Sequence, residues 1–223
     1  MSIWTILILV MVASFLVQTT LQSRFNKYSQ IRNSNGLSGA EVARRMLEDH
    51  GIRDVRISCI PGQLTDHYNP ETNTVNLSES VYSQRSIAAA AVAAHECGHV
   101  VQHYRGYGPI KLRTALVPVV NFSNKAVQWV LLLGVMLFTI TPVFLWLAIA
   151  LFAMSTLFSI VTLPVEINAS KRAVNWLRKY EIADDVTAPY AVDALKWAAY
   201  TYVIAALGSL ATLFYYIGIA RRN

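Results

Sequence analysis

A long stretch without any charged residue runs from residue 126 to residue 163. As a single α-helix it would be roughly 57 Å long at 1.5 Å per residue, almost twice the ~30 Å hydrocarbon core of a bilayer. We therefore expect it to cross a membrane twice. Proline disfavours a helical conformation of the residue before it, so Thr141 and Pro142 are the predicted turn. The first of the two helices must begin before residue 126 to be long enough for a membrane span. We therefore expect a transmembrane helical hairpin over residues 116–164.

Two further apolar stretches lie near the ends of the chain. Residues 3–18 are apolar and two threonines extend them, which predicts an N-terminal transmembrane anchor over residues 1–20. A cleaved signal peptide is the alternative, but no basic residue precedes this stretch. Residues 197–219 form another span with tyrosines near both ends as interfacial anchors. This predicts a C-terminal transmembrane helix over residues 197–223 and about four transmembrane helices in all.

The composition is that of an integral membrane protein. Hydrophobic residues make up 54% of the chain, charged residues make up 14%, and the mean hydropathy is +0.38. The net charge of +6 does not indicate a nucleic-acid partner, because the basic residues lie beside apolar stretches and do not alternate with aromatic residues. Cys59 and Cys97 form no CxxC pair, so a disulfide framework is not expected.

The distribution of basic residues predicts the orientation of the spans. Three basic residues follow the first span closely and little charge precedes it, so the positive-inside rule leaves the N-terminus outside. Residues 21–115 and 165–196 are accordingly expected in the cytoplasm. The two arginines at the C-terminal end would then lie outside, which argues against this orientation.

The segment between the first and second spans has the pattern of a small α+β domain. Ser38 and Glu41 form an S-x-x-E capping box at the start of an amphipathic helix, and Gly51 supplies its C-terminal stop. Residues 54–60 alternate and are rich in β-branched side chains, which predicts a strand. Residues 64–78 have strand-like flanks around the turn NPETN, which predicts a hairpin.

The sequence HECGH places two histidines and a glutamate in a helix otherwise rich in alanine and valine. His95 and His99 lie one turn apart on one face, close enough to bind one zinc ion. Glu96 points to the side of this pair, where it can take a proton from a metal-bound water. The alternative is a buried helix whose polar side chains are satisfied locally, which is costly without partners. A third interpretation makes residues 86–101 a membrane span, but the apolar part is short and weakly hydrophobic.

A catalytic zinc site needs a third protein ligand. Glu166 is the candidate, because it follows the third span and the hairpin returns the chain to the side that it left. The alternative is an interfacial glutamate, although a carboxylate so close to a membrane helix is costly without a role. His103 is expected near the surface or as a supporting residue. The metzincin pattern is excluded, since it requires Gly at position 102 and His at position 105, where the chain has Gln102 and Arg105.

Several segments resemble those of membrane zinc peptidases. A pattern similar to that of HtpX-type gluzincins is formed by HECGH and, after the hairpin, VEINASKRA. A resemblance to the YugP-like neutral zinc metallopeptidases extends over most of the chain, through NKYSQIRNSNGLSGAEVARRML, LTDHYNPETNTVNLSESVYSQRSIAAAAVAAHECGHVVQH and LPVEINAS. The resemblance implies a zincin-like domain in which His95, His99 and Glu166 bind Zn²⁺ and Glu96 is the general base. It also implies a strand edge above the site that holds the substrate backbone, and residues 73–78 match that position.

One position departs from the HtpX-type pattern. Where that pattern has an aspartate assigned to orienting a ligand histidine, the chain has Ser170. Asn168 and Ser170 are the candidates for this supporting role. The residues alone leave open which group stabilises the oxyanion. Four residues are candidates: Tyr68, His67, His103 and Arg172.

These features predict a mainly α membrane protein with a small α+β zincin-like cytoplasmic domain. Its expected function is that of a Zn²⁺-dependent endopeptidase in a bacterial cell membrane, with the active site facing the cytoplasm and residues 165–196 forming a cytoplasmic helix that carries the third ligand. The expected partners are the lipid bilayer and a peptide or membrane-protein substrate, and no nucleic acid. The alternative is a zinc-containing membrane scaffold or adaptor without proteolysis, in which Cys97 or His103 would complete the coordination.

Overall fold

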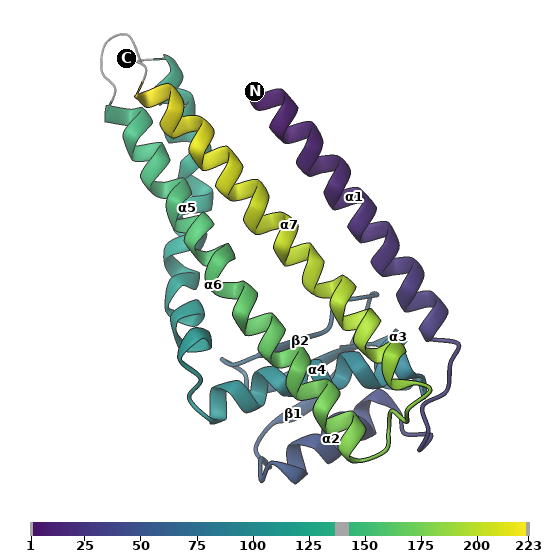
Figure 1. Cartoon of the computed structure of the whole chain (residues 1–223). Helices are drawn as coiled ribbons and strands as arrows, with labels where there is room; N and C mark the ends of the chain where they lie inside the picture. Colours follow the sequence, from purple (N-terminus) through teal and green to yellow (C-terminus); the bar gives the residue numbers. More distant parts are fainter. Residues whose placement is uncertain (1, 137–142, 222–223) are drawn as a thin grey trace. The chain divides into compact units, whose positions relative to one another are not determined.

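The structure is a computed structural model that describes residues 2–136 and 143–221 (Figure 1). The predicted turn at Thr141 and Pro142 lies outside these residues. The chain divides into two compact units, which we describe separately. The apolar-helix unit contains Met1–Leu16, Gly108–Pro164 and Thr201–Asn223, and the site unit contains Val17–Tyr107 and Val165–Tyr200.

Four helices are long and apolar enough to cross a membrane: α1 (Ile3–Tyr28), α5 (Gly108–Met136), α6 (Val143–Lys179) and α7 (Ala188–Ala220). Together with a small three-stranded sheet they confirm the predicted mainly helical fold. Helix α4 (Ile87–Tyr104), which carries the HECGH motif, is not one of the candidate spans found in the described residues.

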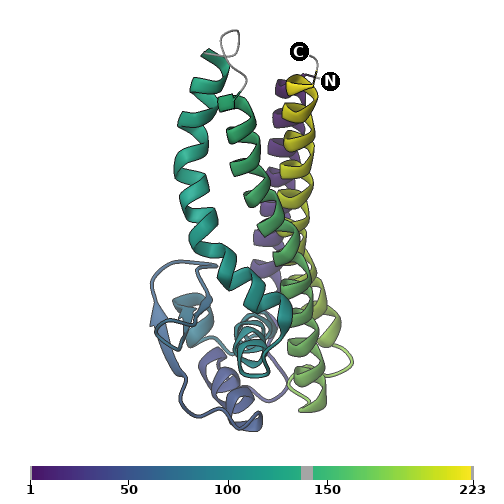
Figure 2. The ribbon, with the colours of Figure 1, turned by 90° about the vertical axis from the view of Figure 1, so that its left-hand side faces the viewer.

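The helices of the apolar-helix unit approach one another closely at glycines. A Cβ added to Gly134 of α5 would lie 2.9 Å from the backbone nitrogen of Leu145 in α6. One added to Gly208 of α7 would lie 2.9 Å from Cγ1 of Val10 in α1. Figures 1 and 2 both show α5 beside the first part of α6. Small residues at helix contacts are typical of membrane bundles. In lipid no hydrophobic force drives helices together, so their association depends on close packing.

The outer surface of this unit is apolar. Its exposed large side chains include Trp4, Phe122, Trp129 and Phe214. In water such a surface would promote association, whereas in a bilayer it faces lipid chains of the same polarity. The surface is therefore that of a helical bundle suited to a membrane.

In the site unit, helix α2 (Gly39–Asp49) begins at the predicted capping box. Oγ of Ser38 accepts a hydrogen bond from the Glu41 N–H at 3.3 Å, and Oε2 of Glu41 accepts one from the Ser38 N–H at 2.7 Å. The helix ends before Gly51, whose φ of +74° favours glycine. The predicted amphipathic helix is confirmed, and it packs against α4 with a buried face formed by Val42, Ala43, Met46 and Leu47.

The sheet has the strand order β1 (Arg56–Ile60), β3 (Thr74–Ser78), β2 (His67–Asn69). The predicted strand and hairpin are confirmed, with β2 antiparallel and β1 parallel to β3. The expectation that residues 73–78 form a strand edge is wrong, because β3 is the central strand. Strand β2 is the edge that contacts α4. Strand β3 becomes central because β1 pairs with it and not with β2. No local sequence pattern determines which strand of the hairpin β1 pairs with.

Helix α4 runs through the core of the site unit. Ser86 caps its start by accepting a hydrogen bond from the Ala89 N–H at 3.2 Å. The helix contacts α2, α3 (Glu79–Tyr82), β2 and β3, and Figure 1 shows it between α2 and β2. Its six alanines are all fully buried, so the small side chains let the surrounding elements come close to its backbone. The histidine helix is therefore a domain core helix.

Candidate metal centre

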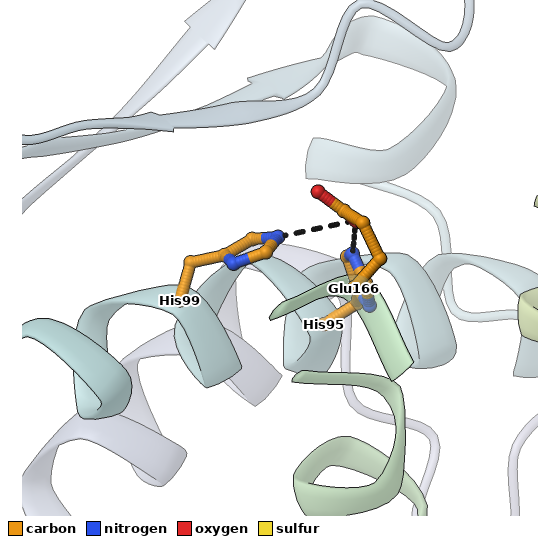
Figure 3. Close-up of side chains that lie close together, drawn as sticks. All are labelled: His95, His99 and Glu166. Carbon is orange, nitrogen blue, oxygen red and sulfur yellow. Dashed lines mark hydrogen bonds and ion pairs between the residues drawn. The ribbon is translucent and has the colours of Figure 1, made fainter. Parts of the chain in front are cut away.

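Three polar side chains from α4 and α6 converge in the site unit (Figure 3). Oε2 of Glu166 on α6 lies 3.2 Å from Nε2 of His95 and 3.5 Å from Nε2 of His99. One potential ligand atom from each residue lies within 4.8 Å of the others. The structure thus brings together the three residues that we predicted as zinc ligands, although Glu166 is 71 residues from His95 in the sequence.

The second ring nitrogen of each histidine has a partner of its own. Nδ1 of His95 lies 3.1 Å from Oγ of Ser170, and Nδ1 of His99 lies 3.0 Å from Oε1 of Gln102. An amide oxygen only accepts, so His99 donates from Nδ1, and in the neutral ring the lone pair of Nε2 then faces Glu166. The Ser170 hydroxyl can accept from His95 in the same manner. Two nitrogen lone pairs and a carboxylate oxygen then face one another, an arrangement that a cation stabilises.

Gln102 connects the two helices of the site, and no motif predicts this role. Its side chain is fully buried, and its Nε2 donates to the backbone oxygen of Val165 at 2.8 Å and to Oδ1 of Asn168 at 3.1 Å. Asn168 also accepts from Nε of Arg172 at 2.7 Å, so its side-chain oxygen is connected to His99 through Gln102. One sequence signal could have indicated Gln102: a polar residue three positions after His99 lies on the same helix face as that histidine.

The two helices come close at Gly98. A Cβ added to Gly98 would lie 2.8 Å from the backbone oxygen of Ala169 and 3.1 Å from its Cα. Glycine costs roughly 1 kcal/mol relative to alanine inside a helix, and this contact is the structural reason for its presence. Because Gly98 lies between His95 and His99, the same approach brings Glu166 of α6 to both rings.

Glu96 is held beside the histidines by the sheet. It is 8% exposed, and its Oε2 accepts a hydrogen bond from the Tyr68 N–H in edge strand β2 at 3.0 Å. Burial raises the pKa of Glu96 to about 7, although His95 and the Tyr68 N–H favour the charged form. A carboxyl group that titrates near neutrality can both take up and release a proton near pH 7.

All four oxyanion candidates have contacts of their own. Tyr68 donates its hydroxyl to Oδ1 of Asn73 at 2.9 Å, and its ring packs edge-on against His103 with 5.5 Å between the centroids. Nε of Arg172 donates a hydrogen bond to Oδ1 of Asn168. His67 is exposed at the start of β2, and its ring nitrogens lie 2.8 Å from the backbone oxygen of Thr65 and 3.2 Å from Nδ2 of Asn76. The contacts of the described residues do not single out an oxyanion partner.

The donor set fits a catalytic zinc ion. Cys97, which sits inside the motif, is buried and its Sγ donates to the backbone oxygen of Ala43 at 3.5 Å. Within residues 2–136 and 143–221, the one group of histidine, cysteine and carboxylate side chains that could hold a metal is His95, His99 and Glu166. Two imidazoles and one carboxylate are a donor set of catalytic zinc sites, whereas structural zinc sites have four protein ligands.

The family of the chain follows from comparison with known proteins. The family described as "Putative neutral zinc metallopeptidase" matches residues 3–221. The chain belongs to this family. One curated relative, the "Putative membrane protease YugP" of Bacillus subtilis (strain 168), is 41% identical over 206 residues, which cover 92% of this chain and 91% of the relative. No solved structure matches the chain.

Membership in this family confirms the resemblance to the YugP-like neutral zinc metallopeptidases. The name of the family implies zinc, and the His95, His99 and Glu166 group is consistent with a zinc site. The four long apolar helices are consistent with a membrane protein of this family.

Proposed function

We propose that the chain is a membrane-embedded zinc endopeptidase that hydrolyses peptide bonds of membrane or membrane-proximal proteins. The observation that carries the proposal is the convergence of His95, His99 and Glu166 within 4.8 Å, with Glu96 next to His95 on the same helix. Zinc held by these three side chains would polarise the scissile carbonyl and lower the pKa of a bound water.

The residues of the site have distinct proposed roles. His95, His99 and Glu166 bind the metal, and Glu96 takes the proton of the attacking water and delivers it to the leaving amine. The Tyr68 N–H holds the Glu96 carboxylate in place at 3.0 Å. Ser170 and, through Gln102, Asn168 orient the ligand histidines. Edge strand β2 lies beside this carboxylate, which makes it the strand suited to align a substrate backbone.

The test is the purified full-length protein with Glu96→Gln, compared with Glu48→Gln on the exposed side of α2. The glutamine keeps the shape of the side chain but cannot accept the proton, so we expect zinc content to be unchanged and cleavage of casein or a membrane-protein substrate to be lost. Glu48→Gln is expected to cleave normally. Proteolysis by Glu96→Gln at the rate of the control would contradict the proposed mechanism.

The alternative, a zinc-containing scaffold or adaptor, makes a different prediction about coordination. A structural site would need a fourth protein ligand. Cys97 is engaged with the backbone of Ala43, and it is not part of the His95, His99 and Glu166 group. X-ray absorption on the zinc-loaded protein distinguishes the two, since three protein ligands plus an oxygen from water support the enzyme and four protein ligands support the scaffold.

We also propose the organisation expected from the sequence. A transmembrane anchor (1–20), a zincin-like domain (21–115), a transmembrane hairpin (116–164), a cytoplasmic helix (165–196) and a C-terminal transmembrane helix (197–223) place the site at the cytoplasmic face of a bacterial cell membrane. The four apolar helices and the bacterial relative described as a membrane protease support this proposal.

The two native cysteines allow a direct test of the orientation. Cys59 is exposed in the site unit and Cys97 is buried. A membrane-impermeant maleimide should therefore label Cys59 in inside-out membrane vesicles and not in right-side-out vesicles or intact cells. Cys59→Ser is the control that should abolish the signal. Labelling of Cys59 in intact cells would place the site on the outer face.

A further inference from the structure

We propose that a groove between α6 and α7 of the site unit binds an anionic phospholipid, with the phosphate at two lysines and part of an acyl chain against the apolar wall. This proposal concerns a site separate from the metal ligands and does not depend on the proposed proteolysis. It rests on the lining of the groove, on its charges and on its position along the two helices.

The groove has a volume of about 310 Å³ and an apolar wall. The wall is formed by side chains from both helices: Ile167 and Val174 of α6, and Val192, Leu195 and Ala199 of α7. Ile167 is 39% exposed and Val192 is 38% exposed, so part of this wall has no cover from the described protein residues. An apolar ligand that covers the wall would remove this surface from water.

Two lysines line the groove from opposite helices. Lys171 belongs to α6 and Lys196 to α7, and both are exposed. Neither takes part in an ion pair among the described residues, and no acidic residue lines the groove. Nζ of Lys196 lies 5.7 Å from the ring centroid of Tyr200, a contact with a neutral ring that does not cancel its charge. A ligand that complements both features carries a negative group joined to an apolar chain.

The position along the helices favours a lipid over a free anion. Lys196 directly precedes the apolar stretch 197–219, and Lys171 lies five residues after Glu166, the first charged residue beyond the long uncharged stretch. Lysines beside a span extend their charge to the headgroup layer while their stems lie on apolar surface. In the proposed organisation the groove lies at the cytoplasmic ends of two helices that continue into membrane spans, where basic residues attract anionic headgroups.

The groove also borders the metal centre. Ser170 is one of its lining residues, and its hydroxyl lies 3.1 Å from Nδ1 of His95. A lipid in the groove would therefore lie one side chain away from a proposed zinc ligand. This arrangement gives the groove a direct physical connection to the site.

The test measures lipid binding to the full-length protein in detergent by native mass spectrometry. We expect phosphatidylglycerol to bind more tightly than phosphatidylcholine, and inorganic phosphate not to compete at the same concentrations. Basic residues near the membrane surface contribute roughly 1 kcal/mol each. Replacing both lysines (Lys171→Gln with Lys196→Gln) should therefore weaken phosphatidylglycerol binding by about 30-fold, and each single change by about five-fold.

Two further variants make the test specific. Lys111→Gln with Lys125→Gln changes two lysines of α5 by the same chemistry and should leave lipid binding unchanged. Ala199→Phe fills the apolar wall without altering charge and should weaken binding of both lipids. Equal binding of the two lipids, an equal loss in the α5 control, or a co-purifying protein segment in place of lipid would each overturn the proposal.

Discussion

Oε2 of Glu166 lies 3.2 Å from Nε2 of His95, and the same oxygen lies 3.5 Å from Nε2 of His99. The two histidines share one helix, so their spacing is a property of α4 alone. Glu166 comes from α6, and its position depends on how closely α6 packs against α4. Zinc affinity should therefore be sensitive to residues that set the distance between these helices as well as to the ligands themselves.

Gly98→Ala tests that packing. The added Cβ would lie 2.8 Å from the backbone oxygen of Ala169, so one helix must shift. Although alanine favours a helix by roughly 1 kcal/mol, overpacking costs about 1–3 kcal/mol. We expect a lower midpoint of thermal unfolding in detergent and weaker zinc binding in a chelator competition. Gly108→Ala is the matched control, because an added Cβ there meets nothing within 4 Å. A variant at Gly98 that binds zinc as tightly as the control would contradict this account.

Gln102→Leu tests the buried amide that connects α4 to α6. Leucine keeps the volume but removes the acceptor for Nδ1 of His99 and both donors to α6. Removing partners that orient metal ligands typically lowers metal affinity 10–100-fold, and we expect a loss in that range. Gln102→Glu retains the acceptor and should restore part of the affinity. If both variants bind zinc within two-fold of the unaltered protein, Gln102 does not position the histidine.

Ser170→Ala removes the partner of Nδ1 of His95. The ring can then rotate or take the other tautomer, so we expect zinc affinity to fall by about ten-fold. Ser170→Asp places a stronger acceptor at the same position, as in the HtpX-type pattern, and should bind zinc at least as tightly as the serine protein. Equal affinities of the alanine and aspartate variants, measured by the same chelator competition, would show that this hydroxyl does not orient His95.

The capping box of α2 predicts a pH-dependent contribution to stability. The Ser38 N–H bonded to Glu41 holds the pKa of that carboxyl below its ordinary value of 4.5. A folded pKa below the unfolded one contributes stability that is complete above pH 4.5 and is lost as the pH falls through the folded pKa. Glu41→Gln should flatten this part of the pH profile of thermal unfolding. Ser38→Ala should lower the free energy of unfolding at neutral pH by about 1 kcal/mol. Identical acid profiles for Glu41→Gln and the unaltered protein would contradict the assignment.

Much of the fold could be predicted from local patterns. The capping residues Ser38 and Glu41, the hairpin around NPETN and the long apolar helices depend on interactions within a few residues or on the length and polarity of a segment. The edge of the sheet could not be predicted in this way. Strand β3 becomes central because β1 pairs with it in parallel, and that pairing depends on the path of the chain between them.

The site shows the same division. The sequence by itself determined the spacing of His95 and His99 and the position of Glu96 beside them, because a helix repeats every 3.6 residues wherever it lies. It also indicated Glu166, because a hairpin returns a chain to the side that it left. Only the tertiary structure decided that Gln102 connects α4 to Val165 and Asn168 of α6 and that the Tyr68 N–H holds Glu96. These contacts join elements that are distant in the sequence, and they exist only because α4, α6 and β2 pack closely enough for their polar atoms to meet.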